Sequence, residues 1–178
     1  FSLGGFIAQE YALIRPHQVR RLVLAGTGPQ GGQGMHMYAP AVLGIALADQ
    51  IDGEGLLNIF FEKSASSRAK GMAFLRRLQA RQANRDTPVS LATRDAHLAA
   101  ISTWGIPDPA KLSRLAAIQQ PTLVANGDND IMVPTVNTHL LARHLPNATL
   151  SIYPDAGHAF LFQYPEQFAA EVNAFLGQ

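Results

Sequence analysis

Hydrophobic residues along this chain are arranged in two different patterns. Helical spacing, with apolar side chains about every three to four positions, occurs in three segments: residues 3–14, 134–145 and 165–176. Short runs of branched apolar residues, typical of buried strands, occur in three others: residues 19–25, 120–126 and 148–153. Because strands and helices alternate at this spacing, we predict parallel βαβ units with right-handed crossovers, and therefore an α/β fold.

Between the first and second of these strands the pattern changes. Residues 35–117 are helical in pattern and contain no strand-like run of comparable quality; their apolar stretches are residues 56–61, 72–78 and 91–101. We therefore predict one all-helical insertion into the core. In this division, residues 1–27 hold a helix and a strand of the core, residues 28–117 form the insertion, and residues 118–178 hold the remainder of the core.

Composition and charge narrow the class of protein. The 178 residues, 47% hydrophobic and 15% charged, suit a globular domain with a substantial core. The net charge of +1 argues against nucleic acid as a partner. No apolar run reaches the roughly 18 residues of a spanning helix, so we expect no membrane segment. The absence of cysteine excludes disulfides, thiolate metal sites and a cysteine nucleophile.

The first residues, Phe1-Ser2-Leu3-Gly4-Gly5, match the right-hand part of a G-x-S-x-G turn between a strand and a helix. A serine hydroxyl becomes nucleophilic when such a turn holds it out from the backbone and a nearby base removes its proton. The backbone N–H of Leu3 would then be one donor of an oxyanion hole, aided by the helix N-terminus. The alternative is that Ser2 only caps the helix that follows it.

Two later turns carry an acid and a histidine. The strand at 120–126 leads into Gly127-Asp-Asn-Asp130, which offers two aspartates, and the strand at 148–153 leads into a turn that holds His158. An aspartate in this setting can accept the Nδ1–H of a histidine and fix its tautomer, and a histidine can take the proton of a serine. The alternative for both aspartates is loop capping.

We expect neither a metal nor a nucleotide cofactor. The other histidines fit ordinary helix or loop positions, and the pair at 139 and 144 is five residues apart and faces different sides of one helix. Residues 26–31 read G-x-G-x-x-G after a strand, as a dinucleotide fingerprint does. Further glycines and a proline at position 40 follow, however, and they leave no room for the crossover helix that a dinucleotide site requires.

The serine turn, the acid turn and the histidine turn, in this chain order, resemble those of the α/β-hydrolase fold family, and within it the serine esterases, lipases and haloperoxidase-like members. The resemblance implies roles for four residues: Ser2 as nucleophile, Asp130 as acid, His158 as general base and Leu3 as an oxyanion donor. It leaves Asp128 to hydrogen-bond backbone amides. It also implies a partial α/β-hydrolase fold that begins at the nucleophile turn, with residues 28–117 as its helical cap.

By the same resemblance we expect a serine hydrolase that cleaves a small carboxylic ester, lactone or related acyl compound through an acyl-enzyme, with no cofactor. A carbon–carbon bond hydrolase or a cofactor-free perhydrolase could use the same residues, and a non-catalytic interaction protein could keep the fold. The candidates for contact with substrate, which could equally be packing residues of the insertion, are Met35, Met37, Tyr38, Phe60, Phe61 and Trp104.

The family's core includes strands before the serine turn and a His-Gly loop that supplies a second oxyanion donor, and this sequence contains neither. We therefore expect that a missing N-terminal half of the core, or another chain, is needed to complete the sheet. Alone, these residues are expected to have little or no hydrolase activity, because one oxyanion donor is worth about 10²–10³ in rate. A cytoplasmic location is the default expectation, and a signal peptide before Phe1 remains open.

Overall fold

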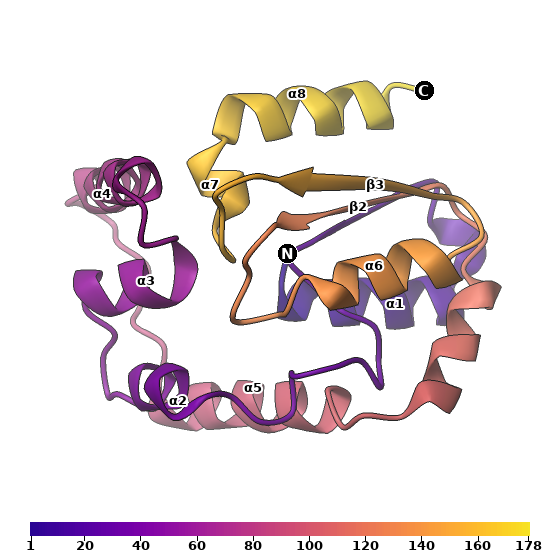
Figure 1. Cartoon of the computed structure of the whole chain (residues 1–178), viewed down its shortest axis with the longest axis horizontal. Coiled ribbons are helices and arrows are strands. Elements are labelled where there is room, and N and C mark those ends of the chain that lie inside the picture. Colours follow the sequence, from indigo (N-terminus) through magenta and orange to yellow (C-terminus); the bar gives the residue numbers. More distant parts are fainter.

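The computed structural model describes residues 1–178 and contains one parallel sheet (Figure 1). Its three strands follow the order β1-β2-β3 across the sheet: β1 Leu22–Ala25, β2 Thr122–Gly127 and β3 Ala148–Tyr153. Leu24 of β1 aligns with Val124 of β2, and Val124 aligns with Leu150 of β3. The predicted α/β fold with parallel strands is confirmed.

The first strand is shorter than predicted. The apolar run begins at Val19, but Pro16–Gln18 form a short 3-10 helix, η1, and strand pairing begins only at Leu22. Val19 instead packs from the side against the apolar core. Val19 is branched and apolar, which is typical of a strand, so the prediction included it. In the structure it contributes to the core without pairing with a neighbouring strand.

Helices cover both faces of the sheet. Figure 1 shows α1 (Leu3–Ile14) and α6 (Val136–His144) on one face, and α8 (Pro165–Leu176) on the other, preceded by the short helix α7 (Phe160–Gln163). The larger apolar core lies on the α1 and α6 face and consists of Ala12, Leu22, Leu24, Leu115, Ile118, Val124, Leu141 and Leu145. A smaller core on the opposite face consists of Ala25, Ala125, Tyr153, Ala156 and Phe160. In α1 the buried residues include Phe6, Gln9 and Ala12, whereas Ile7, Tyr11 and Ile14, whose spacing indicated the helix in the sequence, are exposed. Burial on both faces of the sheet stabilises the domain.

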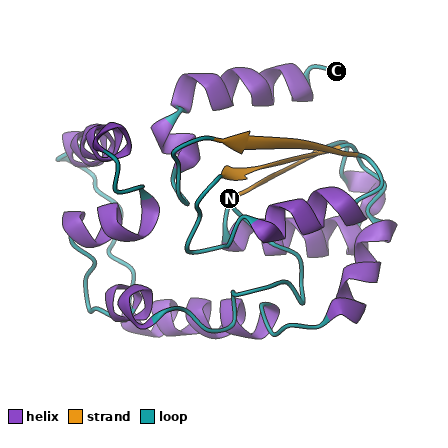
Figure 2. Ribbon diagram, viewed as in Figure 1, coloured by secondary structure: helices purple, strands orange, loops and turns teal.

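Residues 28–117 form helices and no strand (Figure 2). In chain order they are α2 Pro40–Ala46, α3 Gly53–Phe60, α4 Ala65–Ala80, α5 Leu91–Trp104 and the 3-10 helix η2 Pro109–Ala117. The starts of α3, α4 and α5 are fixed by the side chains of Asp52, Ser64 and Ser90, which accept hydrogen bonds from backbone N–H groups of the first turn. These caps start α3 and α4 before their apolar stretches, whereas α5 starts where its apolar stretch does. None of the helices is long and apolar enough to cross a membrane.

The glycine-rich loop after β1 does not lead into a helix at Gly31, so it lacks the geometry of a dinucleotide site. Hydrogen bonds hold it in place: the carbonyl of Gly28 accepts from Gln9 Nε2 and from Trp104 Nε1, both at 3.1 Å. Gly28 leaves little room for a side chain, since a Cβ at this position would lie 2.7 Å from the sulfur of Met35 and 2.9 Å from the Cβ of Asn137. The loop is a packed connection between the sheet and residues further along the chain.

Candidate active site

The carboxyl ends of the three strands bring three turns to one edge of the sheet. The backbone N–H of Ser2 donates to the carbonyl of Ala25, at the end of β1, at 3.0 Å. The acid turn follows Gly127 at the end of β2, and the histidine turn follows Tyr153 at the end of β3. Parallel pairing therefore places residues that are far apart in the sequence side by side.

Ser2 begins helix α1 in a conformation that is rare for residues other than glycine, with φ 52° and ψ −126°. Contacts on both sides hold this conformation. The hydroxyl of Thr27 donates to the carbonyl of Ser2 at 2.8 Å, and Gly5 lies so close to Thr27 that a Cβ would be 2.4 Å from that hydroxyl oxygen. Ser2 makes no side-chain capping hydrogen bond, so the alternative of a simple helix cap is not observed.

The side chains of Ser2, His158 and Asp130 form a continuous hydrogen-bonded series, which we call the serine–histidine–aspartate series. His158 Nε2 lies 3.0 Å from Ser2 Oγ, and His158 Nδ1 lies 2.7 Å from Asp130 Oδ2. His158 is 2% exposed and Asp130 is 4% exposed, so bulk water does not compete for the bond between them.

The carboxylate of Asp130 is held from its other side as well. Its Oδ1 accepts the backbone N–H groups of Met132 at 2.8 Å and Val133 at 2.9 Å. Thr135 closes the same turn, because its hydroxyl donates to the Gly127 carbonyl at 2.7 Å and accepts the Asp130 N–H at 3.3 Å. These bonds leave Oδ2 aimed at the imidazole.

Asp128 has a different partner from Asp130, as the resemblance implied. Its two carboxylate oxygens accept the backbone N–H groups of Asp155 and Ala156, each at 3.0 Å. Both donors belong to the turn that presents His158. Asp128 therefore ties the acid turn to the histidine turn, and of the two aspartates only Asp130 bonds the imidazole.

Two aromatic rings flank the imidazole. The ring centroid of Phe1 lies 4.7 Å from that of His158, and the centroid of Phe60 lies 5.4 Å away. The chain reaches this packing because Gly157 lacks a side chain: a Cβ there would lie 2.8 Å from the carbonyl oxygen of Phe60. The rings shield the imidazole faces while its two nitrogens stay engaged with Ser2 and Asp130.

The backbone N–H of Leu3 has no acceptor in the chain. The neighbouring N–H groups of Gly4 and Gly5 donate to the carbonyls of Phe1 and Ser2, at 2.9 and 2.8 Å. The Leu3 N–H belongs to the first turn of α1, where unpaired amides and the helix dipole favour negative charge. This is the geometry that an oxyanion donor next to a nucleophilic serine requires.

The six residues predicted to face a substrate occupy three kinds of position. Phe60 lies against the imidazole, and Tyr38 is half-buried near Asp130, whose charge adds to burial in raising the pKa of Tyr38 to about 12. Met37 is exposed. The other three pack inside the fold: Met35 against Phe6 and Val133, Phe61 against Leu57 and Leu75, and Trp104 stacked on Phe6.

An apolar pocket of about 580 Å³ lies among the helices of the insertion and reaches Phe60. Its apolar lining includes Ile51, Ile59, Leu91, Leu98, Ile101 and Met132. Arg94 also lines it, but the guanidinium is occupied by Asp95 and by the carbonyls of Leu47 and Ala48. Local sequence patterns did not indicate this pocket, because its walls come from segments that meet only in the fold: α2 and the loop after it, α3, residues 88–89, α5 and the acid turn.

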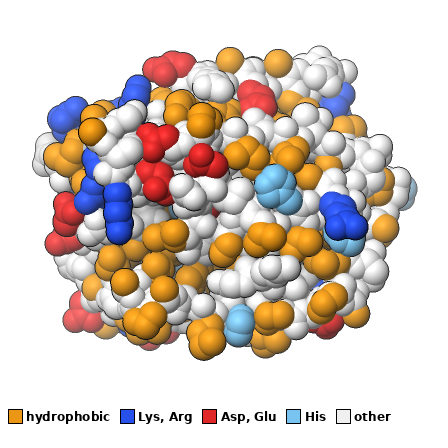
Figure 3. All heavy atoms as spheres, viewed as in Figure 1, with side chains coloured by type: hydrophobic (Ala, Val, Ile, Leu, Met, Phe, Trp, Pro, Cys, Tyr) orange, Lys and Arg blue, Asp and Glu red, His pale blue; other side chains and the backbone are white.

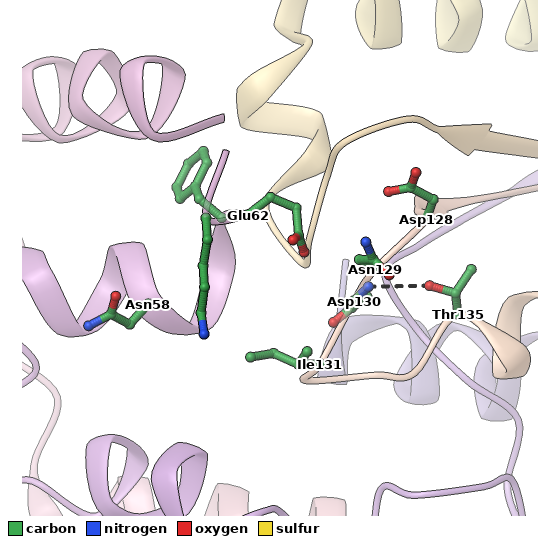
Figure 4. A pocket seen from close by; sticks show the side chains of 9 residues that line it. Asn58, Glu62, Asp128, Asn129, Asp130, Ile131 and Thr135 are labelled. Atoms are coloured by element: carbon green, nitrogen blue, oxygen red, sulfur yellow. Dashed lines mark hydrogen bonds between the residues drawn. The ribbon is translucent and has the colours of Figure 1, made fainter. Parts of the chain in front are cut away.

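A second pocket of about 580 Å³ lies beside the acid turn and is polar (Figure 4). Glu62 of the insertion lies across it from Asp128. Partial burial, together with the charges of Asp128 and Asp155, raises the pKa of Glu62, while Lys63 acts in the opposite direction. Figure 3 shows acidic side chains gathered on this face of the molecule, between the insertion and the sheet. No group of three or more histidine or acidic side chains is arranged to hold a metal ion.

The model of the alpha/beta hydrolase fold family matches residues 1–165. With the parallel sheet and the serine–histidine–aspartate series described above, this match shows that the chain belongs to the alpha/beta hydrolase fold family.

Three proteins that are similar in sequence to this chain carry different names within the family. The pimeloyl-(acyl-carrier protein) methyl ester esterase of Nitrosomonas europaea is 30% identical, over 98% of this chain and 68% of that protein. The 2-hydroxy-6-oxononadienedioate/2-hydroxy-6-oxononatrienedioate hydrolase of Cupriavidus pinatubonensis is 33% identical, over 99% of this chain and 60% of that protein. The solved alpha/beta hydrolase fold protein from Chitinophaga pinensis is 41% identical with a TM-score of 0.90, and the match covers 99% of this chain and 62% of that one. The chain thus spans about two thirds of the length of these relatives.

Proposed function

We propose that the protein containing this chain is a serine hydrolase that cleaves a carboxylic ester or a related acyl compound. The observation that carries the proposal is the unbroken series from Ser2 Oγ to His158 Nε2, at 3.0 Å, and from His158 Nδ1 to Asp130, at 2.7 Å. Its order along the chain, serine before acid before histidine, is that of the family's nucleophile and partners.

The reaction follows from the geometry in two halves. Ser2 Oγ attacks the carbonyl carbon of the substrate while His158 Nε2 takes the hydroxyl proton, and Asp130 stabilises the imidazolium that forms. The Leu3 N–H stabilises the negative charge that develops on the carbonyl oxygen. His158 then gives its proton to the leaving alcohol, and the acyl group remains on Ser2. Water attacks this ester in the second half, with His158 again as base, and releases the acid and Ser2.

The apolar pocket supports an acyl group with little charge. It reaches from Phe60, next to the imidazole, into the insertion, and its single arginine is already paired. A volume of about 580 Å³ is in the range that holds a small organic ligand. We therefore propose that residues 28–117 act as a cap that binds the acyl chain, with Phe60 at its inner end.

A carbon–carbon bond hydrolase is the second candidate. It is favoured by the likeness to the Cupriavidus hydrolase, which is 33% identical to this chain. Such an enzyme would use the same three side chains on a carbonyl compound whose leaving group is a carbon atom. The two candidates differ in the substrate that is consumed, so matched substrates distinguish them.

Active-site labelling tests the proposal directly. The full-length protein is treated with a fluorophosphonate probe, which reacts with an activated serine, and is then assayed with p-nitrophenyl esters of increasing chain length. We expect labelling to vanish in Ser2→Ala and to drop in His158→Ala. Ser113→Ala is the matched control, because Ser113 is exposed on η2 and bonds only the Ala110 carbonyl.

Absence of labelling in a folded wild-type protein would contradict the proposal and favour a non-catalytic interaction protein. Labelling without ester turnover, but with turnover of a vinylogous diketone, would favour the carbon–carbon bond hydrolase.

A further inference from the structure

The insertion is joined to the histidine turn by a buried polar connection outside the serine–histidine–aspartate series. Ser67 of α4 and Gln163 of α7 are 0% and 1% exposed. The hydroxyl of Ser67 donates to Gln163 Oε1 at 2.7 Å. Two such groups buried together must be paired, since an unpaired one is costly.

Each of the two side chains also holds a piece of backbone. Ser67 Oγ accepts the backbone N–H of Glu62 at 2.9 Å, at the end of the segment that carries Phe60. Gln163 Nε2 donates to the carbonyl of Asp155 at 2.7 Å, three residues before His158. The pair therefore links the segment around Phe60 to the turn that presents the imidazole.

Two further hydrogen bonds join the same two segments, the one around Phe60 and the histidine turn. The backbone N–H of Ala159 donates to the carbonyl of Phe60 at 2.9 Å, and the hydroxyl of Ser64 donates to the carboxylate of Asp155 at 2.7 Å. His158 lies between these attachment points, directly before Ala159. The position of the imidazole thus depends on where the insertion lies.

We propose that Ser67 and Gln163 are positioning residues that hold His158 at hydrogen-bonding distance from Ser2 and hold Phe60 against the imidazole. The inference rests on the proposed hydrolase function and adds to it a coupling between the insertion and the general base. Ser67 and Gln163 do not touch the reacting atoms, so we expect them to act through the position of the histidine turn.

The test compares three variants of the full-length protein. Ser67→Ala leaves Gln163 Oε1 and the Glu62 N–H without their partner, and Gln163→Met removes both bonds of the amide. The double variant S67A/Q163M removes both polar side chains, so neither side chain leaves the other unpaired, and its loss of stability should be smaller than the sum of the losses in the single variants. The controls are Ser66→Ala on the exposed side of α4 and Gln167→Met on the exposed side of α8.

We expect kcat for a p-nitrophenyl ester to fall by about tenfold or more in all three variants, because small displacements of a catalytic group are costly. KM should stay within about twofold, since the interaction lost is not one with the substrate. The rate of fluorophosphonate labelling should fall in parallel, and the two controls should match the wild type.

A second readout does not depend on activity. A proton between His158 Nδ1 and Asp130, 2.7 Å apart, is expected to give a far-downfield NMR signal, which His158→Ala would assign by its loss. We expect this proton to exchange faster with water in Ser67→Ala and Gln163→Met than in the wild type. If the wild type is not labelled by the probe, the proposed function fails while this signal still tests the positioning role.

Three outcomes would overturn the inference. They are an unchanged kcat in folded variants, a kcat that recovers in the double variant together with its stability, and an effect confined to KM.

Discussion

Ser2 combines a side chain that faces His158 with a strained backbone. Its φ of 52° and ψ of −126° lie in a region that glycine adopts readily and other residues adopt at a cost of about 1–3 kcal/mol. The structure holds this conformation through the bonds to Ala25 and Thr27 described above. Stability is therefore sacrificed at the position where the hydroxyl must face His158.

A pair of substitutions at Ser2 separates the strain from the hydroxyl. Ser2→Gly and Ser2→Ala both remove Oγ, but only glycine relieves the backbone. We expect Ser2→Gly to be more stable than Ser2→Ala by about 1 kcal/mol in urea unfolding, and both to lose probe labelling. A Ser2→Gly variant less stable than Ser2→Ala would show that the conformation carries no strain, because only relief of strain can offset the chain entropy that glycine adds to the unfolded state.

Asp128 offers a second test at this scale. In Asp128→Asn one oxygen is replaced by an amide NH₂, which faces a backbone N–H of the histidine turn. We expect a loss of about 1–3 kcal/mol in unfolding free energy and a lower kcat. Asp86→Asn is the control, because Asp86 forms an exposed pair with Arg81 and such pairs contribute at most about 1 kcal/mol. A stability loss no larger than that of the control would argue against the tie between the two turns.

Motifs of a few residues indicated the three side chains that meet in the serine–histidine–aspartate series, but not the residues that hold them in place. Ser2, Asp130 and His158 each stand in a turn that follows a strand or opens a helix, so local sequence indicated them. Ser67 and Gln163 show no such signal, because each lies in a helix and they meet only in the folded chain. The roles of Met35 and Trp104 were likewise left open by their residue type alone.

At the scale of elements, the segment around Phe60 and the histidine turn pack without space for a side chain at Gly157. In Gly157→Ala the new Cβ would lie 2.8 Å from the carbonyl oxygen of Phe60, so the bond from the Ala159 N–H to that carbonyl must lengthen or break. We expect lower thermal stability and a reduced labelling rate, measured by calorimetry and by the fluorophosphonate probe.

Gly44 provides the contrast to Gly157. It lies inside α2, and a Cβ there would meet nothing within 4 Å. Gly44→Ala should therefore stabilise the protein by up to about 1 kcal/mol and leave labelling unchanged. If both alanine variants behaved alike, close packing at Gly157 would not be the cause.

Element boundaries that are marked by nearby residues could be predicted from the sequence, and those set by distant contacts could not. The bounds of α1, α8 and β3 match the sequence prediction, since prolines, glycines and apolar periodicity mark them locally. Helix α6 begins at Val136, later than predicted, because Thr135 is used to close the acid turn. Helix α2 and the short helix α7 were not predicted as separate elements, because their apolar residues show no clear helical period.

At the scale of the whole molecule, Glu62 brings charge from the insertion to the end of the sheet. Its pKa is raised by partial burial and by Asp128 and Asp155. The folded protein therefore binds this proton more tightly than the unfolded chain does. The resulting contribution to stability is fully present below the ordinary pKa of 4.5 and is lost as the pH rises through the raised value.

Glu62→Gln should consequently raise the melting temperature at neutral pH, and the gain should disappear in acid. Because Glu62 is only partly buried, solvent screens the repulsion and the effect should be small. Melting curves of both proteins between about pH 4 and pH 8 measure it. A variant less stable than the wild type at pH 8 would contradict this sign.

The bonds between the insertion and the histidine turn have a consequence for protein engineering. Exchanging residues 28–117 for the corresponding part of a relative is an obvious way to graft a new specificity onto this scaffold. Such a chimaera would set a foreign helix opposite Asp155 and Gln163, which Ser64 and Ser67 now satisfy. Grafts that carry residues 155–163 along with the exchanged segment should keep the imidazole in register, whereas grafts that stop at the segment's own ends should not.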